Sequence, residues 1–221
     1  MKARYAIVVI VANSPGEVEG WARPLVASLR ASEARAAEEF GKLKIVIALT
    51  PCPFASGREA EVAAGLPGVD VVVTPSQYVR CVVLGLIPAK MRGLSAEDAG
   101  GPWRGIVVHL GGDHLHSALI ARRLGFPAVA YSDRTAGFAS SFVRFMAEDA
   151  RVREKLERKG VPAGRIEVVG NLMIDGVRPA EARGKTRVAL GLADDADDAP
   201  LVCLLPGSRK QQIRHVMPFF L

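Results

Sequence analysis

The sequence predicts an α/β fold with a Rossmann-like, doubly wound parallel sheet. Short apolar runs alternate with helix-like segments along most of the 221 residues. The first run, YAIVVIVA (5–12), is apolar without polar alternation, as expected of a strand that helices cover on both faces. Repeated strand–helix–strand units of this kind build parallel sheets.

Six further runs are expected to be strands. They are KIVIALT (44–50), VDVVVTP (69–75), GIVVHLGG (105–112), PAVAYS (127–132), FVRFMA (142–147) and RIEVVGN (165–171). Helices are expected from the first turn to about Phe40, and over 57–65, 114–125 and 150–160. The segment QYVRCVVLGL (77–86) fits a helix by its position and a strand by its composition, so its assignment stays open.

A polar stretch near the end of the chain divides the sequence into domains. Residues 179–200 include DDADDA and are typical of a linker. We therefore expect an N-terminal Rossmann-like domain over 1–178. Residues 201–221 read as a new strand and helix, the start of a second domain.

Charge and cysteine content indicate the partners and the compartment. Lys and Arg outnumber Asp and Glu by 29 to 23, and the net charge of +6 suits an anionic partner such as a nucleotide phosphate or an acidic lipid head group. The alternative is that this charge serves only solubility. The basic residues are dispersed without aromatic interleaving, so no nucleic-acid partner is expected. Cys52, Cys81 and Cys203 form no disulfide or metal pattern and fit a reducing cytoplasm.

No apolar run reaches the ~18 residues that a membrane span needs, so any membrane contact is expected to be peripheral. The apolar and basic segment QYVRCVVLGLIPAKMRG (77–93) is the expected place for it. The alternative is that this segment is a core helix followed by a loop.

The loop ANSPGEVEGW (12–21), after the first strand, is one candidate binding site. Gly16 and Gly20 permit close approach to the backbone, and a helix start offers N–H groups to an anion or a sugar hydroxyl. We expect Glu17 to face the ligand, or else to interact with the helix dipole. Trp21 is expected to stack on a sugar or acyl group, or to join the core.

A second candidate is HLGGDHLHS (109–117). Asp113 or His114 would be the general base that deprotonates an acceptor hydroxyl. The alternative is that Asp113 only caps the following helix. The histidines here lack accompanying cysteines or carboxylate clusters, so no metal is expected.

The third candidate is LPGSRKQQI (205–213). A glycine turn and a helix beginning at Ser208 provide backbone donors, and with Arg209 they suit a diphosphate. A capped helix with a solvated basic face is the alternative. The GxxxxGK[ST] pattern of P-loop proteins is absent.

These motifs resemble a known family. VVGNLMIDGV (168–177), followed by LLPGSRKQQIRHVMPFFL (204–221), is similar to the hinge region of the lipid-A-disaccharide synthase family, which has a Gly-(Asn/His)-Pro-x-x-Asp turn and then LLPGSR. Residues 11–29 resemble that family's first loop, GExSGD. The resemblance extends in order over most of the chain and is tight only at the hinge.

The sequence departs from the family pattern at three places. Leu172 stands where the turn has Pro, and Glu19-Gly20-Trp21 stands where the first loop has Ser-Gly-Asp. The family's Asp-x-Pro-Asp-Phe-Asn loop corresponds to residues 110–115, with Leu110 in place of the first Asp, to which a catalytic role is attributed, and Asp113 in place of the second.

The resemblance implies a GT-B architecture, in which two Rossmann-like domains face each other across a cleft. It makes residues 1–178 the acceptor-side domain and residues 201–221 the incomplete start of the nucleotide-sugar-binding domain. It implies a hexosamine-type sugar moved with inversion from a UDP-sugar donor to a lipid or sugar acceptor, without a metal or other cofactor. Gly207, Ser208 and Arg209 would lie at the donor diphosphate. Gly16, Glu17 and Gly20 would line the cleft, and the hinge residue Asn171 is expected to contact substrate as well.

On the same resemblance we expect the remaining strands of a C-terminal domain, which do not follow Leu221. The chain would then be a truncated N-terminal portion, inactive alone, of a cytoplasmic protein that is peripheral on the inner face of the membrane. A homo-oligomer is left open. Two alternatives are a UDP-N-acetylglucosamine 2-epimerase-like enzyme, whose loops resemble VHLGGD and VVGNLMID, and a non-catalytic sugar-nucleotide-binding module.

Overall fold

The computed structural model describes residues 5–53, 55, 57–91, 105–132, 136–177, 181–192, 202–206 and 210–221. The chain forms two compact units, Met1–Val177 and Arg178–Leu221. Within the described ranges, no helix combines the length and the apolar character needed to cross a membrane.

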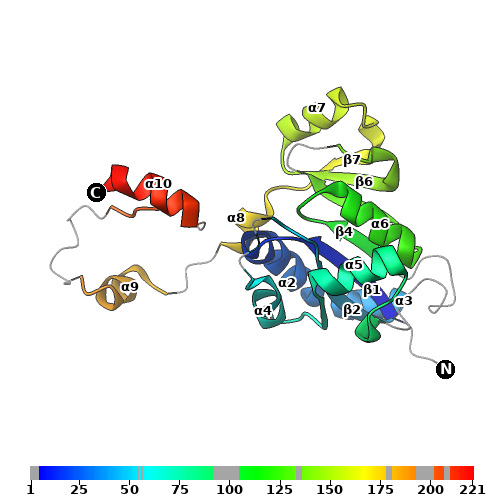
Figure 1. Cartoon of the computed structure of the whole chain (residues 1–221), viewed down its shortest axis with the longest axis horizontal. Helices are drawn as coiled ribbons and strands as arrows, with labels where there is room; N and C mark the ends of the chain where they lie inside the picture. Colours follow the sequence, from blue (N-terminus) through cyan, green and yellow to red (C-terminus); the bar gives the residue numbers. More distant parts are fainter. Residues whose placement is uncertain are drawn as a thin grey trace. The chain divides into compact units, whose positions relative to one another are not determined.

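The first unit is built on a seven-stranded sheet (Figure 1) whose order is β3-β2-β1-β4-β5-β6-β7. Every neighbouring pair of strands is parallel. The strands are β1 (Tyr5–Ala12), β2 (Lys42–Leu49), β3 (Val71–Val73), β4 (Gly105–His109), β5 (Ala128–Ser132), β6 (Phe142–Ala147) and β7 (Ile166–Val168). The predicted fold class is confirmed, and each of the seven apolar runs forms a strand.

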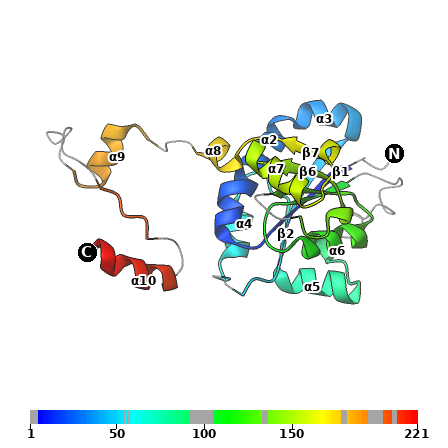
Figure 2. The ribbon, with the colours of Figure 1, turned by 90° about the horizontal axis from the view of Figure 1, so that it is seen from above.

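Helices cover both faces of this sheet (Figure 2) because its strands are apolar on both sides. One core cluster contains Val9 and Val11 of β1, and side chains from α5 (Pro75–Leu84), α6 (His114–Leu124) and α7 (Ala150–Arg158) pack on it. The other contains Val8 and Ile10 of β1. It is covered by the helical segment that follows β1, by α4 (Glu59–Gly65) and by Leu172 of α8 (Leu172–Gly176). Short 3₁₀ turns complete the unit: η2 (Ala89–Met91), η3 (Ala139–Ser141) and η4 (Ala163–Arg165).

Local capping signals explain where α5 and α6 begin and end. Thr74 and Gln77 form a reciprocal capping box at the start of α5, and Gly85 ends it in a left-handed conformation. The segment whose assignment the sequence left open is therefore a helix. Asp113 caps the start of α6, and Gly125, with φ of 69°, ends it.

The helical segment after β1 is more divided than the single helix that the sequence predicts. It consists of α1 (Pro15–Glu17), a π-helical turn η1 (Val18–Ala22), α2 (Arg23–Ala31) and α3 (Glu33–Phe40). The break between α2 and α3 falls at Ser32, a residue type that favours helix ends over helix interiors.

The strand order identifies a topological switch point between β1 and β4. From β1 the chain proceeds to β2 and β3 on one side, and from β4 to β5, β6 and β7 on the other. In open parallel sheets, ligands bind outside the carboxyl ends of the strands at such a point. The residues there are Asn13 after β1, Thr50 after β2 and Leu110–Asp113 after β4.

The second unit contains α9 (Arg183–Ala189) and α10 (Lys210–Phe220). The stretch predicted as a linker thus includes a helix, in which Arg187 is buried. The strand predicted from Leu201 is not formed, since residues 202–206 have no strand assignment and residues 202–205 are exposed. An extended segment becomes a strand only when its backbone pairs with a neighbour.

Candidate functional site

The loops after β1 and β4 meet at the switch point through Glu17. The backbone N–H of Asn13 donates to Glu17 Oε2 at 2.7 Å, and Ser14 Oγ accepts from the Glu17 N–H at 3.3 Å. The Glu17 carboxyl group lies directly over Gly111, where a Cβ would come within 2.1 Å of Glu17 Cδ. Residue 111 must therefore be glycine for the carboxylate to occupy this place.

Gly112 continues this arrangement toward β2. Its φ of 84° is in the left-handed region, and a Cβ there would lie 2.8 Å from Asn13 Nδ2 and 3.4 Å from Thr50 Oγ1. The Thr50 side chain is buried, and its hydroxyl has no hydrogen-bond partner among the described residues. We call the five residues Asn13, Glu17, Thr50, Gly111 and Gly112 the strand-end corner.

Asp113 is exposed at the start of α6. Its Oδ1 accepts a hydrogen bond from the Leu115 N–H at 2.8 Å, so the capping role weighed from the sequence is present. One carboxylate oxygen can cap the helix while the carboxylate still faces solvent. The geometry is therefore compatible with capping and with proton transfer.

His114 lies behind Asp113 in an aromatic cluster. Its imidazole stacks on His109, with ring centroids 4.3 Å apart, and meets Phe142 edge to face at 5.1 Å. His109 Nδ1 is 2.8 Å from Ser117 Oγ. Because His114 is only 4% exposed, the geometry favours Asp113 over His114 as the base.

Burial, together with repulsion from His114, lowers the pKa of His109 from 6.5 to about 3. At a pH between these two pKa values, His109 is protonated in the unfolded chain and neutral in the folded chain. The free energy of unfolding must therefore fall as the pH falls. From pH 7 to pH 5 we expect a loss of about 1–2 kcal/mol, measured by urea unfolding. His116, whose pKa burial also lowers, contributes in the same direction.

His109→Gln, which can keep a hydrogen bond to Ser117, should flatten this pH dependence. A wild-type protein equally stable at both pH values would contradict the assignment.

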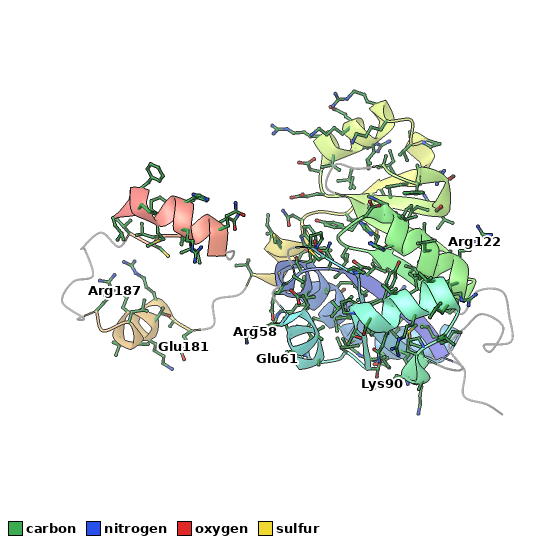
Figure 3. All side chains as sticks on the ribbon, in the orientation of Figure 1. Arg58, Glu61, Lys90, Arg122, Glu181 and Arg187 are labelled. Atoms are coloured by element: carbon green, nitrogen blue, oxygen red, sulfur yellow. The ribbon has the colours of Figure 1, made fainter. Side chains whose placement is uncertain are left out.

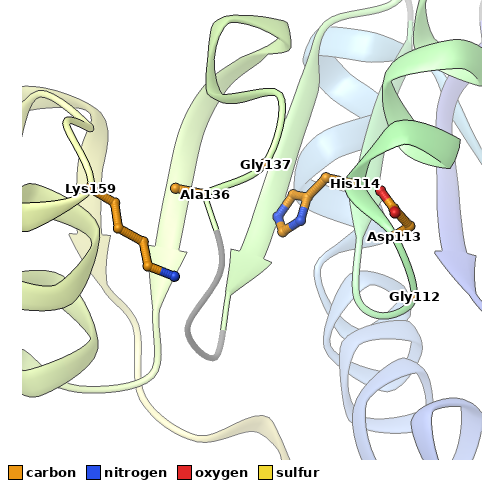
Figure 4. A pocket seen from close by; sticks show the side chains of 6 residues that line it. All are labelled: Gly112, Asp113, His114, Ala136, Gly137 and Lys159. Atoms are coloured by element: carbon orange, nitrogen blue, oxygen red, sulfur yellow. The ribbon is translucent and has the colours of Figure 1, made fainter.

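A pocket of about 660 Å³ opens beside Asp113 (Figure 4), and its lining residues are Gly112, Asp113, His114, Ala136, Gly137 and Lys159. The Lys159 side chain extends from the end of α7 toward the pocket, facing the His114 imidazole across it. Sequence reasoning missed Lys159, since it belongs to a charged segment that reads as an ordinary surface helix. No signal in the sequence relates it to Asp113.

Gly20 and Trp21 pack against the hinge turn. A Cβ on Gly20 would lie 2.7 Å from Met173 Cε, and Trp21 contacts Tyr131 edge to face, with ring centroids 5.9 Å apart. The Tyr131 hydroxyl donates to the Gly170 carbonyl and accepts from the Leu172 N–H, both at 3.2 Å. These contacts hold residues 170–173 against the rest of the first unit.

Asn171 caps α8 by accepting from the Met173 N–H, and its side-chain amide donates to Glu148.

Gly16 is exposed, and a Cβ there would meet no atom within 4 Å. Gly207, Ser208 and Arg209 lie outside the described residues. Over the described part of the chain, no three His, Cys, Asp or Glu side chains are grouped so as to hold a metal ion.

Comparison with known proteins gives structural neighbours only. No family model and no curated protein match the sequence. One neighbour is a Listeria monocytogenes protein assigned as a UDP-N-acetylglucosamine 2-epimerase, with a TM-score of 0.54 and 15% sequence identity. The match covers 85% of the present chain and 51% of the Listeria chain. Another is S. aureus MnaA, solved with UDP, with a TM-score of 0.51 and 12% sequence identity. The match covers 85% of the present chain and 51% of the MnaA chain.

A weaker likeness, with a TM-score of 0.46 and 11% identity, relates 75% of the chain to 45% of WaaB, a lipopolysaccharide outer core galactosyltransferase. The chain thus spans about half the length of these neighbours. At these identities the neighbours show the fold, a single Rossmann-like α/β domain of the kind found in the GT-B architecture.

Proposed function

We propose that the chain is the acceptor-side part of a UDP-sugar-dependent glycosyltransferase, which moves a hexosamine-type sugar to a lipid or sugar acceptor. The observation that carries this is the exposed Asp113 carboxylate at the rim of a pocket beside the switch point. The neighbour solved with UDP supports a nucleotide sugar as the donor. The sequence motif LLPGSR supports transfer.

In this mechanism Asp113 accepts the proton of the acceptor hydroxyl as the hydroxyl oxygen attacks the anomeric carbon. The bond between that carbon and the diphosphate oxygen breaks on the opposite face, so the configuration inverts and UDP departs with the bonding electrons. Cationic support for the leaving diphosphate is assigned to Arg209. No metal or organic cofactor takes part in the proposed reaction.

A second candidate is epimerisation of the UDP-sugar at C2. It is favoured by the Listeria neighbour, whose name specifies this activity. Both reactions need a base at the sugar, so the pocket alone does not distinguish them. The two reactions differ in their products, a new glycosidic linkage or a C2 epimer.

The test is to incubate the full-length protein with UDP-N-acetylglucosamine, with and without an acylated glucosamine acceptor, and to analyse the products by NMR. Release of UDP that depends on the acceptor, together with a new glycosidic linkage, would establish the transferase. A C2 epimer formed without acceptor would establish the epimerase instead. Binding of UDP-sugar without a product would indicate a non-catalytic module.

We also propose that the end of α5 contacts a membrane surface on the cytoplasmic side, where a lipid acceptor would be drawn. Three apolar side chains are exposed there: Val83 (70%), Leu84 (65%) and Leu86 (58%). Figure 3 shows the Lys90 side chain projecting from the bottom of the first unit and the Arg122 side chain from its right edge. Residues 75–91 and 114–124 contain no Asp or Glu, so this surface suits anionic lipids.

The triple variant Val83→Ser, Leu84→Ser, Leu86→Ser should bind vesicles of phosphatidylcholine and phosphatidylglycerol at least about tenfold more weakly than the wild type, because apolar contact contributes about 0.8 kcal/mol per buried CH₂. Vesicle flotation measures the bound fraction. Val143→Ser with Val168→Ser, two exposed valines on β6 and β7, is the control. Equal binding of wild type and triple variant would refute the proposed contact.

A further inference from the structure

The loop after the first strand of a Rossmann-like sheet is where many such proteins hold a phosphate group, against the free N–H groups that begin the first helix. In this chain a carboxylate is already present there. Glu17 Oε2 accepts the Asn13 N–H at 2.7 Å, and the carboxyl group covers Gly111 at the end of β4. Glu17 and Asn13 are both only partly buried, so a ligand can reach them.

The strand-end corner also contains a polar group that the described residues do not satisfy. Thr50 is 1% exposed, and its hydroxyl finds no partner among the described residues. Buried hydroxyls normally have partners, and one that lacks a partner calls for a specific explanation such as a ligand or a bound water. Thr50 lies next to Gly112, so this unmet hydrogen-bonding capacity belongs to the same corner as Glu17.

Together these groups are suited to a hydroxyl ligand. A carboxylate is an acceptor only, a threonine hydroxyl both donates and accepts, and the Asn13 carboxamide does both. A sugar hydroxyl can donate to Glu17 while it accepts from its other neighbours. A phosphate oxygen, by contrast, has no hydrogen to offer Glu17 and carries charge of the same sign.

We infer that the strand-end corner binds an uncharged hydroxyl of a carbohydrate, and that Glu17 excludes phosphate from it. The inference rests on the proposed function and deepens it, because it assigns the neutral part of the sugar substrate to this corner and requires the diphosphate to be held elsewhere. Of the two ligand types that the first loop suggests from sequence, an anion or a sugar hydroxyl, it selects the hydroxyl.

Glu17→Gln tests the charge with little change in shape. The Gln carbonyl oxygen can still accept the Asn13 N–H, so the loop should keep its conformation and the melting temperature should stay unchanged. Glu19→Gln is the matched control: it removes a carboxylate two residues away that is exposed and paired with Arg23. Thr50→Val removes only the buried hydroxyl, and without ligand it should fold at least as stably as the wild type.

The measurement is an amide-resolved NMR titration of the isotope-labelled full-length protein with N-acetylglucosamine and, separately, with inorganic pyrophosphate. In the wild type the sugar should shift the amides of Asn13, Gly111 and Gly112, and pyrophosphate should leave them unmoved. In Glu17→Gln the sugar should bind about fivefold to tenfold more weakly, and pyrophosphate should begin to shift these amides, since one like charge near the site changes affinity by about tenfold. Thr50→Val should weaken the sugar without admitting pyrophosphate.

Three results would overturn the inference: pyrophosphate shifts at these amides in the wild type, no sugar shifts there, or a Glu17→Gln variant that treats both probes as the wild type does. The outcome is separate from that of the proposed function. A protein that selects sugar over pyrophosphate at this corner but forms no glycosidic product would keep the inference and refute the transferase.

Discussion

Replacing Asp113 with Asn is expected to lower the rate of sugar transfer by the full-length protein about 10²–10⁴-fold, the range that general bases contribute. The variant removes the basic oxygen and keeps the cap. Asn is as good an N-cap residue as Asp, and its side-chain oxygen can accept the Leu115 N–H as Asp113 Oδ1 does. Stability and substrate binding should therefore change little while turnover falls.

Asp149→Asn is the matched control for this experiment. Asp149 caps α7 by accepting the Val152 N–H at 2.7 Å, and it does not line the pocket. The rate of acceptor-dependent UDP release should be that of the wild type in Asp149→Asn and strongly reduced in Asp113→Asn. If both variants transfer sugar at the wild-type rate, Asp113 is only a helix cap.

Truncating Phe142 to Ala is expected to cost about 3–5 kcal/mol of unfolding free energy, as for other buried aromatic residues. Phe142 is 1% exposed, belongs to the core of β6, and contacts the rings of His109, His114 and Phe145. Its loss leaves a cavity beside the wall of the pocket. His114 should then become more mobile, which would broaden the NMR signals of the imidazole.

Phe138→Ala provides the comparison within the same chain. Phe138 is 50% exposed, so the same truncation there should cost less than about 1 kcal/mol. Urea unfolding of both variants measures the difference directly. Comparable losses at the two positions would mean that the aromatic cluster at His114 is not packed as described.

Much of the fold follows from the sequence because it is determined by local composition. The apolar runs of β1 and β2 are strands whose side chains are largely buried on both faces, and Gly125 and Asp113 mark the ends of α6 by conformations that their residue types favour. The break at Ser32 and the π turn at 18–22 were not predicted. Serine favours helix ends, but a serine alone does not specify a break, and the π turn depends on how the helix face packs on the sheet, which local propensity does not encode.

The candidate site was predictable only in part. Asp113 stood out because a carboxylate follows a glycine pair at the end of a strand. The contact of Glu17 with Gly111 and the approach of Lys159 to the pocket join segments far apart in the sequence, and no single stretch contains the information. The roles assigned to Gly16, Trp21 and Asn171 stay predictions.

The π turn at residues 18–22 has a consequence for how insertions are accommodated in this chain. Val18, Ala22 and Val26 are all buried on one side of the first helical segment, although successive members are four residues apart. An α-helix needs about 3.6 residues for each revolution and a π-helix about 4.4. The four-residue step from Ala22 to Val26, in the α-helix, is therefore slightly more than one revolution, and the step from Val18 to Ala22, in the π turn, is slightly less. The two angular errors nearly cancel, and all three side chains stay in line. Five π-helical residues turn the chain by about 410° and four α-helical residues by about 400°, so the π turn holds one extra residue, and deleting that residue would leave the later side chains of the segment on the same side.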